Sequence, residues 1–84
     1  MPTILNISGC RIIIWPDDHA PPHVHIFKGS GEAKINLGNA DEAPCLVTIH
    51  GLTKQEIRSA WEMVAENQAV LLIAWRRIHE QLDN

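Results

Sequence analysis

The chain has 84 residues, of which 45% are hydrophobic and 20% are charged. This is the composition of an ordinary globular domain, and the length allows one hydrophobic core without a separate substrate domain. The formal net charge of −3 argues against a general nucleic-acid-binding protein, because such proteins usually have a basic excess. We therefore expect a single domain over residues 1–84, strand-rich over 1–50 and helical over 51–84.

The hydrophobic segments are too short to cross a membrane. The longest are Ile12–Trp15 and Ala69–Trp75, whereas a spanning helix needs about 20 apolar residues. The N-terminus has no basic region ahead of an apolar segment, so we expect no secretory signal and a cytoplasmic location. In a reducing cytoplasm, Cys10 and Cys45 are expected to be free, buried thiols.

The first 22 residues predict a hairpin followed by a loop. Two segments rich in isoleucine, Thr3–Ile7 and Cys10–Trp15, flank Ser8-Gly9, which is typical of a tight turn between antiparallel strands. The segment Pro16–Pro22 contains three prolines and two aspartates, a composition that regular secondary structure does not tolerate. We expect a loop there.

The next two strands are predicted at His23–Lys28 and Glu32–Leu37. Apolar residues alternate with the histidines along the first of them, so the histidines should lie on the face opposite the core, which we expect to be polar and accessible. Matching the faces of the two strands requires a loop of even length, and we predict four residues. This register places His25 opposite Lys34 or Asn36.

The second half of the chain follows a helical pattern after one more strand. Cys45–His50 is expected to form a short fifth strand at the sheet edge. Thr53-Lys54-Gln55-Glu56 is a capping box, which predicts a helix start. One unbroken helix over 54–82 would be about 43 Å long, too long for this domain. We predict a break near Glu66-Asn67, with Asn67 capping the second helix.

Together these elements predict an α+β fold. It consists of an antiparallel meander of four or five strands, followed by two C-terminal helices packed on one face of the sheet. His50 and His79 lie far from the other histidines in the sequence, and we expect structural roles for both.

Three of the five histidines lie in one short motif, His19-Ala20-Pro21-Pro22-His23-Val24-His25. The two prolines hold the chain extended as it approaches His23. His23 and His25 are two residues apart, so on a strand both imidazoles project from the same face. Histidine changes its protonation near neutral pH and is the commonest metal ligand, so this motif predicts a functional site.

Two chemistries suit this motif, and the residues leave both open. In metal-free RNA cleavage, His23 and His25 would act as the catalytic acid and base, and Lys34 or Lys28 would stabilise phosphate charge. Asp17 or Asp18 would then orient an imidazole.

The second chemistry is a metal site. His19, His23 and His25 would supply three nitrogen ligands to zinc or another divalent transition metal, with an open position for water or substrate. Asp18 or Asp17 would be a further ligand or would orient a ligating histidine. A histidine cluster that only forms an interaction surface is the non-catalytic alternative.

The sequence resembles a small bacterial family of domains of unknown function. The resemblance rests on the opening Met1-Pro2-Thr3-Ile4 and on the HxPPHxH motif that begins at His19. Members are often encoded beside an antitoxin-like protein. The resemblance therefore implies the toxin-like component of a type II toxin–antitoxin pair, with an antitoxin-like partner, and the metal-free chemistry above would make RNA its substrate. It assigns no catalytic residues, and the alternative is a non-catalytic protein-binding or metal-binding regulatory module.

Overall fold

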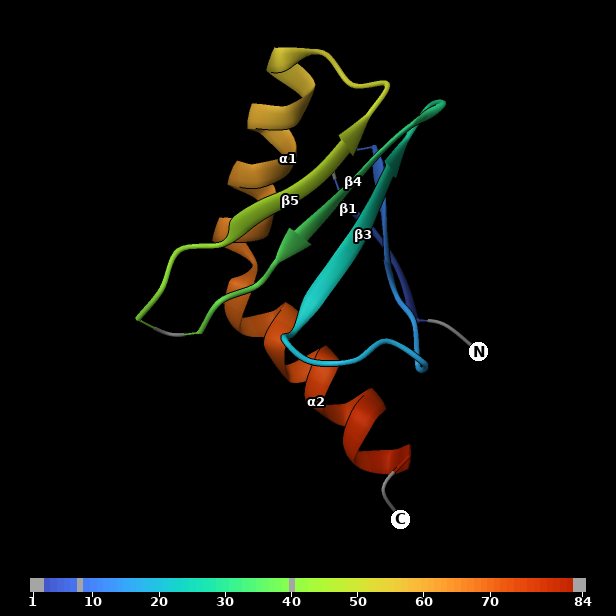
Figure 1. Cartoon of the computed structure of the whole chain (residues 1–84), viewed down its shortest axis with the longest axis vertical. Coiled ribbons are helices and arrows are strands. Elements are labelled where there is room, and N and C mark those ends of the chain that lie inside the picture. The colour runs from blue at the N-terminus through green and yellow to red at the C-terminus, as the bar shows by residue number, and fades with distance from the viewer. Residues whose placement is uncertain (1–2, 8, 40, 83–84) are drawn as a thin grey trace.

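The structure, a computed structural model, describes residues 3–7, 9–39 and 41–82. Five antiparallel strands form one sheet in chain order, and two helices follow them. The elements are β1 (Thr3–Ile7), β2 (Cys10–Ile14), β3 (His23–Lys28), β4 (Gly31–Asn36), β5 (Cys45–His50), α1 (Lys54–Glu66) and α2 (Gln68–Leu82). The helices lie along one side of the sheet, with α2 extending past the start of β3 (Figure 1). The predicted α+β fold is confirmed, with five strands.

The loop of the β3–β4 hairpin has an even number of residues, as predicted, but it is shorter than expected. His25 pairs with Lys34, one of its two predicted partners, and Lys28 pairs with Gly31. The loop therefore has two residues instead of the predicted four, because β4 begins one residue earlier than Glu32. Gly31 is required at this place, since a Cβ atom there would lie 2.5 Å from the carbonyl oxygen of Gly51.

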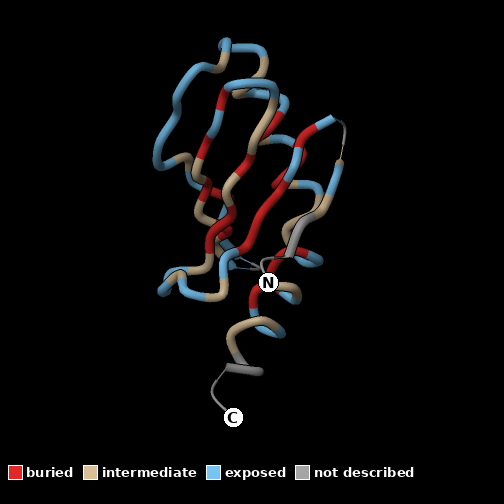
Figure 2. The backbone as a smooth tube through the Cα atoms, turned by 90° about the vertical axis from the view of Figure 1, so that its right-hand side faces the viewer, coloured by how far each residue is buried: buried red, intermediate tan, exposed pale blue. Residues whose placement is uncertain are grey.

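The core lies between the sheet and the two helices. Strands β2, β3 and β4 each contribute fully buried side chains, and buried residues run along the middle strands in Figure 2. The segment after β4 and the two helices contribute others. The largest fully buried side chains are Ile12, Ile14, Val24, Ile26, Ile35, Leu37, Val64 and Leu71. Both cysteines are free, but Cys45 is exposed, contrary to expectation, because it begins the edge strand β5.

The start of α1 is confirmed as a capping box. The Thr53 hydroxyl accepts from the Glu56 amide at 3.1 Å, and the Thr53 amide donates to the Glu56 carboxylate at 2.9 Å. Two donors that a helix N-terminus leaves unpaired are thereby satisfied. This pairing explains why the helix begins at Lys54.

The break between the helices falls at Asn67, as predicted. The Asn67 side chain, however, caps the end of α1 and not the start of α2. Its side-chain amide donates to the Met63 carbonyl at 2.8 Å, so the side chain caps the end of α1. Only its backbone carbonyl serves α2, by accepting from the Leu71 amide at 2.9 Å. Neither helix, within the described residues, is long and apolar enough to cross a membrane.

Candidate metal centre

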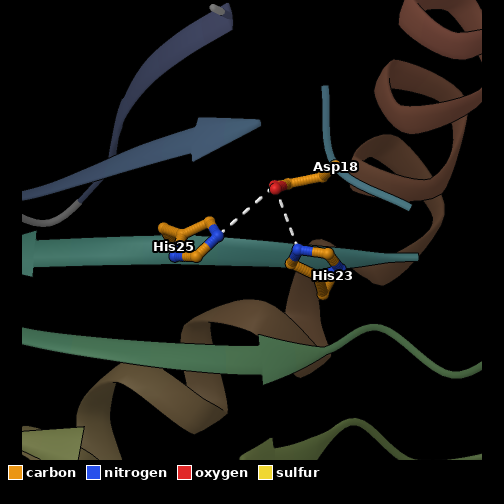
Figure 3. A group of neighbouring side chains, drawn as sticks. All are labelled: Asp18, His23 and His25. Atoms are coloured by element: carbon orange, nitrogen blue, oxygen red, sulfur yellow. Dashed lines mark ion pairs between the residues drawn. The ribbon is translucent and has the colours of Figure 1, made fainter. Parts of the chain in front are cut away.

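The loop between β2 and β3 brings Asp18 onto the two histidines of β3. The Asp18 amide donates to the Trp15 carbonyl at 3.1 Å, which turns the chain back toward the strand. One carboxylate oxygen, Oδ2, then lies 3.0 Å from Nε2 of His23 and 3.3 Å from Nε2 of His25. Figure 3 shows both rings directed at this oxygen. The motif therefore gathers three side chains of ligand type at one point.

His23 has a fixed tautomer. Its Nδ1 lies 2.9 Å from the Pro21 carbonyl oxygen, which can only accept a hydrogen bond. Nδ1 must therefore carry the hydrogen, and in the neutral ring Nε2 presents a lone pair to Asp18. A ligating histidine commonly donates its other N–H to a backbone carbonyl in this way. The Pro21 carbonyl thus prepares Nε2 of His23 to bind a cation.

The prediction of an accessible histidine face is wrong for His23, which is 4% exposed. Its ring lies against the indole of Trp75 on α2, with 5.1 Å between the centroids. His25 remains open, with 25% of its side chain exposed. The difference arises because Trp75 of α2 packs on the His23 ring, and α2 passes the start of β3 (Figure 1).

The carboxylate of Asp18 is buried against these rings without a hydrogen bond. Oδ2 is inaccessible to solvent and forms no hydrogen bond with any residue that the structure describes, despite its short distances to both ring nitrogens. An unpaired buried carboxylate oxygen costs free energy. It also faces the lone pair of neutral His23. A positive charge at this point, from a proton or a metal ion, would remove both penalties.

The spacing of the three groups suits a metal ion. Their ligand atoms all lie within 4.8 Å of one another. Two ligands about 2.0–2.1 Å from a tetrahedral zinc ion are separated by about 3.3 Å, close to both distances from Asp18 Oδ2. Two histidines and one carboxylate are the ligand set of many zinc hydrolases and of iron(II) oxygenases. These three residues therefore fit a divalent transition metal.

Two aromatic side chains of α2, Trp75 and His79, contact the residues of the centre. His79 stacks on Trp75, with 3.7 Å between the ring centroids. Its Nε2 lies 2.9 Å from the Asp18 carbonyl oxygen and its Nδ1 lies 2.8 Å from the Trp75 carbonyl oxygen. The helix therefore contacts the Asp18 backbone through His79 and the His23 ring through Trp75. Sequence reasoning expected a structural role for His79 but did not place it beside the motif.

The other residues that the sequence suggested for the site are not among the three grouped side chains. Lys34 is directly opposite His25 in the β3–β4 register. Lys28 is at the far end of β3, and Asp17 is exposed on the loop. His19 is also exposed and is not one of the three grouped residues. The structure thus brings Asp18, rather than His19, to the two histidines of the strand.

Comparison with known proteins identifies a family without an assigned activity. Residues 9–76 match the family model of a domain of unknown function, DUF4160. The chain belongs to this family. The matched range includes the loop, β3 and Trp75, and therefore the whole candidate centre. No curated protein and no solved structure gives a significant match.

Proposed function

We propose that this DUF4160 protein binds a divalent transition metal ion through Asp18, His23 and His25. The decisive observation is the buried Oδ2 of Asp18, which faces Nε2 of His23, the nitrogen that carries the lone pair of the neutral ring because Nδ1 donates to the Pro21 carbonyl. A bound cation converts two opposed acceptors into two ligands. Zinc and iron(II) are the ions that this ligand set suits.

The same geometry supports a hydrolytic role. Three protein ligands leave coordination positions for water or substrate, and a metal ion in such a site polarises the substrate and activates water. The His25 and Asp18 side chains are 25% and 24% exposed, so the centre borders solvent although Oδ2 of Asp18 itself is buried. Lys34, opposite His25, places a cation beside it. We propose that the substrate is an anion such as a phosphodiester.

Zinc titration by calorimetry at pH 7.5 tests the metal proposal. The wild type should bind one ion per chain. Both His25→Ala and Asp18→Asn should weaken binding by roughly 100-fold or more, because each removes one of three ligands. His19→Ala is the matched control, since it removes an exposed histidine next to Asp18 and should bind zinc as the wild type does.

Circular dichroism of each variant shows whether its fold is intact. Absence of zinc binding by the wild type, or unchanged binding by His25→Ala, contradicts the proposal. Loss of binding in His19→Ala with retention in Asp18→Asn would instead support His19, His23 and His25 as the ligands.

A second candidate is the toxin-like component of a bacterial type II toxin–antitoxin pair, acting in the cytoplasm on RNA. The pairing of Lys34 with His25 favours it, because one imidazole and one cation lie together on the same face. His23 is less suited to metal-free acid–base catalysis, since it is buried and both its ring nitrogens have close partners. The antitoxin-like protein encoded nearby would be its partner.

Expression of the wild type and of His25→Ala tests this candidate. The toxin proposal expects growth arrest by the wild type, relief by the variant, and relief on co-expression of the neighbouring protein. Normal growth with the wild type contradicts it. An RNA-cleavage assay with and without a chelator then separates the metal-dependent route from the metal-free one.

A further inference from the structure

A pocket lies at the end of the sheet where β3 begins and β4 ends. Its volume is about 410 Å³, and small-molecule sites typically measure about 300–1,000 Å³. Its walls come from the segment before β3, the connection between β4 and β5, and one side of α2, and these segments meet at that end of the sheet in Figure 1. None of the three proposed metal ligands lines it. We call it the side pocket, and its residues used below include Pro21, Pro22, Asn36, Leu72 and Arg76.

Hydrogen bonds hold the walls of the side pocket in place. The Leu37 amide donates to the Pro22 carbonyl at 2.8 Å, which fixes the end of β4 against the start of β3. On α2, the side-chain amide nitrogen of Gln68 lies 2.7–2.9 Å from three backbone carbonyl oxygens that follow β4. These are the carbonyls of Leu37, Asn39 and Glu42. The segment after β4 is thereby tied to the helix, so the pocket is formed without a ligand.

The lining of the side pocket combines apolar walls with one cation. Pro21, Pro22 and Leu72 offer apolar surface against which a flat ring can pack. Arg76 lines the same pocket and is exposed. A guanidinium group binds a phosphate through two parallel hydrogen bonds. The pocket therefore suits a small molecule that has a ring system and an anionic group.

Glu42 is the acidic residue of the lining. Its carboxylate accepts a hydrogen bond from the side-chain amide of Asn39. Among the ion pairs of the described side chains there is none between Glu42 and Arg76. The Glu42 carboxylate therefore does not occupy the Arg76 guanidinium, although its negative charge should weaken the binding of an anion in the same pocket.

The side pocket and the metal centre share one face of the sheet. Asn36 lines the pocket and lies directly opposite His23 in the β3–β4 register. Lys34, opposite His25, is two residues before Asn36, so its side chain projects from the same face. Pro21, whose carbonyl oxygen accepts from Nδ1 of His23, also lines the pocket. A ligand in the side pocket therefore lies next to the metal centre.

We propose that the side pocket binds an organic phosphate of nucleotide size, with its phosphate on Arg76 and its base against Pro21 and Pro22. The side-chain amide of Asn36 can both donate and accept hydrogen bonds, which suits the polar edge of a base. The pocket would then hold one nucleotide of a phosphodiester whose reacting group lies at the metal centre. This last step rests on the function proposed above, whereas binding in the pocket does not.

An NMR titration of the isotope-labelled protein with adenosine monophosphate tests the proposal, with a chelator present and no added metal. The wild type should bind with a dissociation constant below about 1 mM, and the amide signals of Gly38, Asn39 and Arg76 should shift most. Arg76→Gln should weaken binding by about tenfold or more, because it removes a charged partner of the phosphate. Arg77→Gln is the matched control, since Arg77 is the neighbouring exposed arginine and does not line the pocket.

Further probes and variants separate the parts of the site. Adenosine, which lacks the phosphate, and inorganic phosphate, which lacks the ring system, should each bind at least about tenfold more weakly than the nucleotide. Cys45→Phe should abolish binding, because Cys45 lines the pocket from the exposed edge strand and a larger side chain there fills it. Glu42→Gln should bind the nucleotide at least as tightly as the wild type, since it removes a negative charge.

Three results would overturn the proposal: no shifts on addition of the nucleotide, shifts confined to residues outside the pocket, or equal losses of affinity in the two arginine variants. The last would mean that the helix attracts anions only through its overall charge. Arg76→Gln should bind zinc as the wild type does, because it removes no proposed ligand. Nucleotide binding without zinc binding would contradict the metal centre alone, and zinc binding without nucleotide binding would contradict the side pocket alone.

Discussion

The start of α1 and the loop before β3 are both held by contacts of side chains with backbone, but their partners come from different distances along the chain. Thr53 and Glu56 satisfy each other three residues apart. Asp18 depends on His79, which contacts its carbonyl from 61 residues away. The first arrangement is complete in a short peptide segment, whereas the second exists only after α2 has packed on the sheet. The two regions should therefore respond differently to substitutions in α2.

The largest expected effect comes from Trp75→Ala. Trp75 is buried and its ring contacts those of His23 and His79, so its removal leaves a large cavity and takes a packing partner from both histidines. Substitutions of this kind cost about 3–5 kcal/mol of unfolding free energy. Urea denaturation measures the loss, and zinc affinity should fall with it. Trp15→Ala is the matched control, because Trp15 is 39% exposed and should cost much less. Equal losses in the two variants would contradict this assignment.

His79→Ala should lower metal affinity in a protein that still folds. It removes the contact of α2 with the Asp18 carbonyl but none of the three proposed ligands. Loss of a group that orients a ligand typically lowers metal affinity by about 10–100-fold, and calorimetry should measure a change of this size. His50→Ala, an exposed histidine on β5, should leave zinc affinity unchanged. Wild-type affinity in a folded His79→Ala protein would show that His79 does not position Asp18.

Features that depend on neighbouring residues could be predicted from the sequence. The capping box and the order of the strands follow from local residue patterns, and both are confirmed. The alternation along β3 restricts the cross-strand partner of His25 to Lys34 or Asn36, and the structure shows that it is Lys34. These features depend on residues that are close in sequence or on the fixed geometry of paired strands.

The arrangement around Asp18 was only partly predictable. The motif itself pointed to His23 and His25, and Asp18 was considered as a further ligand. Nothing local indicates that Trp75 buries His23 or that His79 contacts the Asp18 carbonyl, because both come from the distant helix α2. Sequence reasoning therefore located the motif but treated His19 as an equal member of the group.

Thr53→Ala should destabilise the protein without affecting the metal centre. It removes the hydroxyl that accepts from the Glu56 amide at the start of α1. Loss of such a cap costs about 1 kcal/mol of unfolding free energy, which urea denaturation can resolve. Zinc affinity should equal that of the wild type, because the capping bonds that the structure describes here join Thr53 to Glu56 and involve none of Asp18, His23 and His25. Thr53→Ser, which keeps the hydroxyl, is the control and should remain close to wild-type stability.

The smallest expected effect is the pH dependence of the same helix start. The amide of Thr53 donates to the Glu56 carboxylate and holds the pKa of Glu56 below its ordinary value, with smaller lowering contributions from the Thr53 hydroxyl and from Lys28. Because the folded pKa is the lower one, the carboxylate stabilises the fold fully above its unfolded pKa of about 4.3. This stabilisation is lost as the pH falls through the folded pKa.

Comparison of the wild type with Glu56→Gln isolates this contribution. Glutamine can still occupy the capping box but does not titrate in this range. The wild type should therefore be slightly more stable than Glu56→Gln at pH 7, and the difference should shrink as the pH is lowered below about 4.3. Denaturation curves of both proteins at a series of pH values measure it. A difference that stayed constant with pH would mean that the charge of Glu56 does not stabilise the helix start.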